Sequence, residues 1–144
     1  MACETVIGSD PRKFGAIPAH VHLEGRPQDV RAARLFVQEQ LADQLEAKIH
    51  EVEMIVSELV TNVVRRGTGP TTVGVTRFID PPSVLITVTD TEAEFDTFAD
   101  LASGRSPAQV GGGRGLQIVQ AFSSEVGWKP VDPGKVVWAR AALS

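Results

Sequence analysis

The stretch from Glu51 to Arg66 constrains the fold of this chain most, because its apolar residues repeat with the period of a helix. They recur at i, i+4, i+7 and i+11, at Val52, Val56, Leu59 and Val63. This spacing predicts a helix with one buried stripe, which needs a second layer of structure to cover it. At about 100° per residue, Glu58 and Asn62 lie almost on top of each other on the neighbouring face. They are either solvated residues beside the core or a carboxylate and an amide that address one ligand.

The size and charge of the chain narrow the class of protein. It has 144 residues, of which 42% are hydrophobic, which is enough for one domain with a core. We expect residues 19–144 to form this domain and residues 1–18 to be a loose leader, because the glycines and prolines of the leader show no period. A net charge of −4 without any Lys/Arg run argues against direct contact with nucleic acid. Cys3 has no partner cysteine, and neither a signal peptide nor a membrane span is evident, so we expect a cytoplasmic protein.

The remaining elements alternate between strand and helix patterns. In chain order we expect a strand at residues 19–23, a helix at 30–45, a break at 47–50, the opening helix, strands at 71–79 and 84–89, a helix at 116–122, and strands at 125–129 and 135–143. Short turns containing proline join the last two pairs of strands, which makes each pair an antiparallel hairpin. This order predicts an α+β fold, a two-layer sandwich with helices on one face of a mixed, mostly antiparallel sheet.

Asp90 stands out in the first hairpin. Val84, Ile86 and Val88 share one face of their strand, and the same period places Asp90 on that apolar side at the strand end. Burying an unpaired carboxylate is costly, so Asp90 needs a hydrogen-bond donor from the protein or from a ligand. The alternative is a turn-forming aspartate that caps the next loop.

A glycine run leads directly into the third predicted helix. The run spans Gly111 to Gly115 and is followed by Leu116, while residues 91–110 have weak periodicity and predict a lid or binding loop. Glycines before a helix free backbone N–H groups to bind an anion, although a flexible hinge has the same composition. The chain has no G-x-x-x-x-G-K-[ST] sequence, and the run does not follow the first strand of a βαβ unit. Neither a P-loop nor a dinucleotide-binding fold is therefore favoured.

Four segments in this order resemble one known family. They are SELVTNVVRRG, then VTD at a strand end, then GGGRGLQIV, and then WKPVDPGKVVWA. Together they resemble the GHKL-type, histidine-kinase-like ATPase domain with its Bergerat-type ATP-binding fold, and specifically the small anti-sigma factor kinases of bacteria. The resemblance covers about residues 19–143. It implies an anti-sigma factor with ATP-dependent serine/threonine kinase activity, which binds a sigma factor and phosphorylates an anti-anti-sigma (STAS-type) antagonist protein, and it suggests a homodimer.

The resemblance also implies roles for individual residues. Glu58 would be the catalytic general base, Asn62 would ligate the Mg²⁺ that bridges the ATP phosphates, and Asp90 would accept a hydrogen bond from the adenine amino group. A hard cation prefers oxygen ligands, and a carboxylate one turn away can take the proton of an attacking hydroxyl. The phosphates would be held by the lid and the glycine run, at Arg105, Gly111, Gly113, Arg114, Gly115 and Leu116.

The chain departs from the family pattern at the adenine end. The family often has D-x-G-x-G here, whereas this chain reads Asp90-Thr91-Glu92-Ala93-Glu94. The two added carboxylates would each cost about 1 kcal/mol beside the phosphates of ATP. Lys135 and Val136 also stand where a threonine is expected at the start of the last strand. We therefore expect weakened ATP binding, and the alternative function is a non-catalytic partner-binding module on the same scaffold.

Overall fold

Six strands and three helices make up the described part of the chain. The computed structural model describes residues 4–7, 19–66, 69–91, 114–131 and 134–144. Its elements are β1 (Glu4–Ile7), β2 (Ala19–Leu23), α1 (Asp29–Gln40), α2 (Glu46–Arg66), β3 (Thr71–Ile79), β4 (Pro82–Asp90), α4 (Arg114–Phe122), β5 (Glu125–Pro130) and β6 (Lys135–Ala142).

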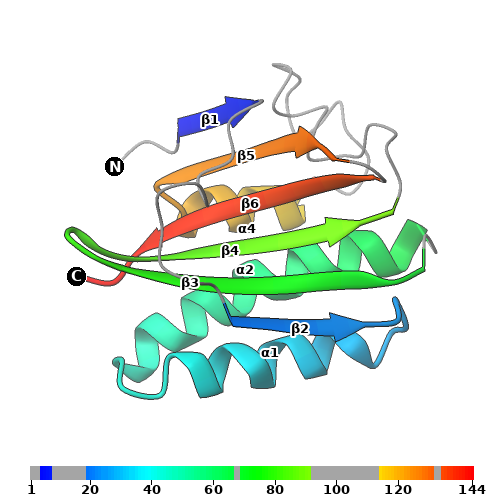
Figure 1. The fold of residues 1–144 in the computed structure, drawn as a ribbon. Coiled ribbons are helices and arrows are strands. Elements are labelled where there is room, and N and C mark those ends of the chain that lie inside the picture. Colours follow the sequence, from blue (N-terminus) through cyan, green and yellow to red (C-terminus); the bar gives the residue numbers. More distant parts are fainter. Residues whose placement is uncertain (1–3, 8–18, 67–68, 92–113, 132–133) are drawn as a thin grey trace.

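The strands form one sheet in the order β1-β5-β6-β4-β3-β2, and the helices lie on one of its faces (Figure 1). Neighbouring strands are antiparallel except for β1, which runs parallel to β5. This arrangement confirms the predicted fold class, a two-layer α+β sandwich with a mixed, mostly antiparallel sheet.

The core lies between α2 and the covered face of the sheet. The predicted stripe of α2 is buried, and Ile55 and Val60 widen it. The sheet residues that pack in the same cluster are Val73, Val75, Val84, Ile86, Val88, Val137, Ala139 and Ala141. They alternate along β3, β4 and β6, so the position in each strand decides which side chains face the helices.

The boundary between the first two helices differs from the prediction. α1 ends at Gln40 instead of near Leu45, and α2 begins at Glu46 instead of Glu51. The predicted break at residues 47–50 is therefore wrong, and the chain turns at residues 41–45. The physical reason is that Ile49 packs against the core cluster in register with the stripe of α2, so burial extends the helix toward its N-terminus.

α1 begins at a carboxylate that binds the turn before it. One oxygen of Asp29, Oδ2, accepts hydrogen bonds from the backbone N–H groups of Glu24, Gly25 and Arg26, at 3.0, 2.8 and 2.9 Å. The bond from Arg26 is the largest cause that lowers the pKa of Asp29, burial opposes it, and the bonds from Gly25 and Glu24 lower the pKa further. Asp29 thus joins β2 to α1 through hydrogen bonds from the backbone.

Part of the N-terminal segment joins the sheet. The expectation of a loose leader is wrong for residues 4–7, which form β1 and pair with β5, Glu4 lying opposite Glu125. Four residues are too few to give a readable period, and this strand forms on the edge that β5 provides. Residues 8–18 of the predicted leader lie outside the described residues.

Candidate functional site

Three polar side chains form a row across one end of the sheet. Asp90 closes β4, and it lies opposite Thr71, the first residue of β3, and Lys135, the first residue of β6. In each strand, the residue two positions away belongs to the core cluster; these residues are Val73, Val88 and Val137. Residues two positions apart in a strand lie on the same face, so all three polar side chains face the helices. The predicted position of Asp90 on the apolar side of β4 is confirmed, and Asp90 is 4% exposed.

Two helices bring further groups to the same end. α2 ends at Arg66, and Thr71 begins β3 after a short connection. α4 runs the other way, because Phe122 is soon followed by Glu125, which pairs with Arg140 at the far end of β6. The N-terminus of α4 therefore points toward the end of the sheet that holds Asp90, and Figure 1 shows α2 and α4 on the same face.

Glu58 and Asn62 lie on a row of α2 that starts beside α4. Met54 lines a cavity of about 390 Å³ together with Ile118 and Phe122 of α4. Glu58 and Asn62 follow Met54 at i+4 and i+8, and each step advances about 6 Å along the helix. Because the two helices are antiparallel, this row leads from the middle of α4 toward its N-terminus.

The side chains of Glu58 and Asn62 are both half-buried. Among the described residues, no hydrogen bond or ion pair joins either side chain to another residue. Glu53, five residues earlier on the same helix, differs: it is buried, accepts a hydrogen bond from Gln38 and lies 3.8 Å from an Arg34 nitrogen. Glu53 thus belongs to the packing of α1 on α2, whereas the half-buried side chains of Glu58 and Asn62 have no such role among the described residues.

Asp90 has the partner that its burial requires, and that partner is Lys135. The lysine Nζ lies 3.0 Å from Oδ2 and 3.2 Å from Oδ1 of Asp90, and Lys135 is 0% exposed. The predicted need for a donor is therefore met by the protein itself. In the sequence, Lys135 stands out only because it occupies the position of an expected threonine, and no local pattern predicts its contact with Asp90.

The energies of the competing interactions decide how firmly this pair holds. A hydrogen bond between neutral groups contributes about 0.5–1.5 kcal/mol, and one to a charged group about 1.5–3 kcal/mol. Removing one member of a buried ion pair costs about 3–5 kcal/mol, because the other charge stays buried without compensation. A neutral donor from outside the protein is therefore a poor substitute for the Lys135 ammonium group.

The backbone around the pair is close-packed as well. Gly134, just before β6, has a φ of +89°, and a Cβ at this position would overlap the backbone carbonyl oxygen of Asp90. Thr71 is 3% exposed, and its hydroxyl donates a hydrogen bond of 2.6 Å to the backbone carbonyl of Thr89. The end of β4 is thus fixed from both neighbouring strands.

The predicted phosphate site is described only in part. Arg105, Gly111 and Gly113 lie outside the described residues, and so do Glu92 and Glu94. α4 begins at Arg114, two residues before the predicted start at Leu116, so Arg114 and Gly115 lie in its first turn instead of before it, and Leu116 follows in the same turn. Within the described ranges, no group of three or more His, Cys, Asp or Glu side chains is arranged to hold a metal ion.

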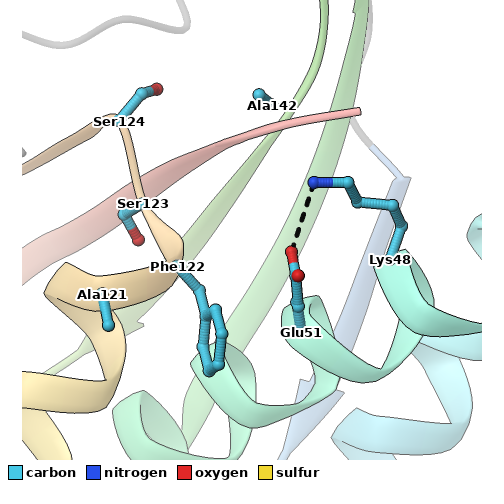
Figure 2. Close-up of a pocket in the computed structure, with 7 residues that line it drawn as sticks. All are labelled: Lys48, Glu51, Ala121, Phe122, Ser123, Ser124 and Ala142. Carbon is cyan, nitrogen blue, oxygen red and sulfur yellow. Dashed lines mark hydrogen bonds and ion pairs between the residues drawn. The ribbon is translucent and has the colours of Figure 1, made fainter. Parts of the chain in front are cut away.

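A separate cavity lies at the opposite end of the sheet. It has a volume of about 340 Å³, and Figure 2 shows Lys48 and Glu51 of α2 facing Phe122 and Ser123 across it. The Lys48 ammonium lies 3.4 Å from the Glu51 carboxylate. Because Ala142, the last residue of β6, also lines it, this cavity is remote from Asp90 and is not part of the candidate site.

The two ends of the candidate site fit a magnesium nucleotide unequally. The amide oxygen of Asn62 is a suitable ligand for Mg²⁺, the carboxylate of Glu58 is a suitable base, and the N-terminus of a helix favours phosphate. At the other end, the acceptor predicted for the adenine amino group is already bound by Lys135. Asn62, Glu58 and the N-terminus of α4 thus have the chemistry that a metal ion and phosphates require, whereas Asp90 already accepts from a charged donor of the protein.

None of the helices in the described segments has both the length and the apolarity needed to cross a membrane.

Comparison with known proteins places these observations in a wider setting. The sequence model of the histidine kinase-like ATPase domain matches residues 23–141. No curated protein sequence is similar enough to count as a match. Among solved structures, the RsbU and RsbW domains of Rv1364c from Mycobacterium tuberculosis are similar in fold, with a TM-score of 0.64 and 20% sequence identity. The alignment covers 89% of this chain and 33% of that chain, so this chain spans about a third of the solved chain.

Proposed function

This chain belongs to the histidine kinase-like ATPase domain family, and from that premise we propose that it is an anti-sigma factor with ATP-dependent serine/threonine kinase activity. In this role it binds a sigma factor in the cytoplasm and phosphorylates an anti-anti-sigma antagonist of the STAS type. The observation that carries the proposal is the pair Glu58 and Asn62, half-buried on one row of α2 that leads toward the N-terminus of α4. We also predict that the protein forms a homodimer.

The chemistry of the chain's own residues supports phosphoryl transfer. Glu58 takes the proton from the serine or threonine hydroxyl of the antagonist. The Asn62 amide oxygen would hold Mg²⁺, and the N-terminus of α4, with Arg114 and Gly115 in its first turn, would favour the phosphates. When bound, ATP would supply the phosphoryl group and leave as ADP, and Mg²⁺ would neutralise charge on the phosphates.

The test is a phosphotransfer assay with Glu58→Gln. Purified protein is incubated with Mg²⁺, labelled ATP and a panel of purified STAS-domain proteins from the same organism. We expect transfer to at least one of them, and we expect Glu58→Gln to slow it by about 10²- to 10⁴-fold because a general base is lost. Sigma-factor binding, measured by pull-down from the same preparations, should be unchanged.

Glu51→Gln provides the matched control. Glu51 is a glutamate of the same helix, but it pairs with Lys48 at the cavity of Figure 2. The Glu51→Gln variant should transfer phosphate at the native rate. Transfer that is as fast in Glu58→Gln as in Glu51→Gln would contradict the assigned base, and no transfer by the native protein would contradict the kinase.

One observation favours a second function, a partner-binding module that does not turn over ATP. The buried ion pair of Asp90 with Lys135 occupies the group proposed to bind adenine. If the purified protein binds a sigma factor but transfers no phosphate to any STAS-domain protein, it has this second function.

A further inference from the structure

The ion pair of Asp90 and Lys135 occupies the base end of the candidate site. Both side chains face the helices, as the predicted nucleotide site does, and they sit directly opposite each other on β4 and β6. The ammonium group contacts both carboxylate oxygens, and neither residue is appreciably exposed. A base that approaches Asp90 therefore meets a carboxylate whose two oxygens already accept from a charged donor.

The strengths of the interactions decide which donor prevails. The amino group of adenine is neutral, whereas Lys135 is a cation that is shielded from water beside its counter-ion. A hydrogen bond from a neutral donor is weaker than one from a charged donor, and release of Lys135 would break a buried ion pair. The base thus gains little from Asp90 as long as Lys135 stays in place.

We propose that Lys135 competes with the nucleotide base for Asp90, and that this competition limits both the affinity for ATP and the choice between ATP and GTP. The inference rests on the proposed function, because it takes the end of β4 as the place where the base lies. It differs from the expected effect of Glu92 and Glu94, which would repel the phosphates of any nucleotide equally.

The choice between bases gives this competition a measurable signature. Adenine presents an amino donor where guanine presents a carbonyl oxygen. A carboxylate without a charged partner accepts from the first group and repels the second, so it favours adenine. A carboxylate that is neutralised by a lysine has lost most of this preference, since the ammonium group attracts the carbonyl oxygen of guanine.

The experiment measures the affinities of the native protein and of Lys135→Thr for Mg-ATP and Mg-GTP by titration calorimetry. We expect the affinities of the native protein for ATP and GTP to lie within about 3-fold of each other. Lys135→Thr should bind ATP at least about 10-fold more tightly than the native protein, because one added hydrogen bond can supply this gain, while its affinity for GTP should change less. A change in folding stability alone alters both affinities together, so the ATP-to-GTP ratio isolates the effect on the base.

Two further variants control for charge and for folding. Lys48→Thr removes the same charge at the opposite end of the sheet, and its ATP-to-GTP ratio should equal the native one. If Lys135→Thr does not fold, Lys135→Met takes its place, because it keeps the buried aliphatic volume and removes only the charge.

The outcomes separate this inference from the proposed function. The competition is overturned if the native protein prefers ATP over GTP by more than about 30-fold. It is also overturned if a Lys135 variant shows no gain in ATP affinity and no rise in the ATP-to-GTP ratio. Both results hold whatever the phosphotransfer assay shows. A variant that gains ATP affinity supports the competition even if the native protein transfers no phosphate, and in that case only the kinase assignment fails. Binding of neither nucleotide by any variant overturns both.

Discussion

Glu58 and Asp90 are both acidic residues of the candidate site, yet their surroundings differ in every respect. Glu58 is half-buried on α2 and, within the described residues, its carboxylate contacts no donor. Asp90 is buried at the end of β4, where Lys135 binds both of its oxygens. At the proposed phosphate end the carboxylate of Glu58 is thus unpaired within the described residues, whereas at the proposed base end the carboxylate of Asp90 is used within the fold.

This difference teaches that a motif residue can be present in the sequence and still be committed to another task. Asp90 stands where the family resemblance places it, but its carboxylate now helps to hold β4 to β6. The same substitution would therefore mean different things at the two ends. At Glu58 it should change chemistry alone, and at Asp90 it should change the stability of the whole protein.

The largest effect that tests this comparison is expected for Asp90→Ala. Loss of the carboxylate leaves the Lys135 ammonium buried without its counter-ion, so the free energy of unfolding should fall by about 3–5 kcal/mol. This corresponds to a loss of roughly 10 °C or more in melting temperature for a domain of this size. Denaturant unfolding followed by circular dichroism measures it.

Two companions make that measurement decisive. Glu58→Ala should stay within about 0.5 kcal/mol of the native stability, because its side chain is half-buried and makes no hydrogen bond or ion pair with the described residues. The double variant Asp90→Val with Lys135→Met should recover most of the lost stability, since both charges are then gone. Equal losses in Asp90→Ala and Glu58→Ala would show that the two ends do not differ.

A smaller effect is expected at the phosphate end for Asn62→Ala. If its amide oxygen ligates Mg²⁺, the affinity for Mg-ATP should fall by at least about 10- to 100-fold. Loss of a residue that only supports a metal ligand already has an effect of this size. The affinity for ATP without Mg²⁺ should not change. Calorimetric titrations with and without Mg²⁺ measure both values, and Thr61→Ala, the neighbouring residue of α2, serves as the control. An equal drop with and without Mg²⁺ would argue against a metal ligand.

The smallest effect is expected for Asp29→Ala, which compares two buried carboxylates that have different kinds of partner. Asp29 is 5% exposed, much like Asp90, but its partners are backbone N–H groups, so its loss leaves no buried charge. We expect a destabilisation of about 1–2 kcal/mol, as for the loss of a helix cap. Unfolding experiments at neutral pH should rank this variant well below Asp90→Ala.

The same variant has a defined pH dependence. Because the pKa of Asp29 is lower in the folded protein than its usual 3.8, its stabilising effect is complete above pH 3.8 and is lost as the pH falls through the folded pKa. The gap in stability between the native protein and Asp29→Ala should therefore close in acid. A gap that is the same at pH 3 and pH 7 would contradict this explanation.

Much of the fold could be predicted because its signals are local. The period of Val52, Val56, Leu59 and Val63 predicted the buried stripe of α2, and two hairpins followed from turn residues between β-rich runs. The predictions were wrong where packing decided the outcome. Ile49 extends α2 because it meets the core, and β1 forms because β5 offers an edge. Ile49 continues the helical period of the stripe, but only its contact with the core shows that the helix extends to it, and the four residues of β1 are too few to show a period.

For the site, the sequence by itself determined which chemical groups are available and on which face each lies. Helical and strand periods depend only on neighbouring residues, so they place Glu58 beside Asn62 and Asp90 on the apolar side of β4. Only the tertiary structure decided what each group contacts. Asp90 and Lys135 are 45 positions apart and meet because β4 and β6, which are not consecutive strands, pair in this register. The register follows from packing of the whole sheet, and with it the carboxylate that the sequence offered to a base became half of a buried ion pair.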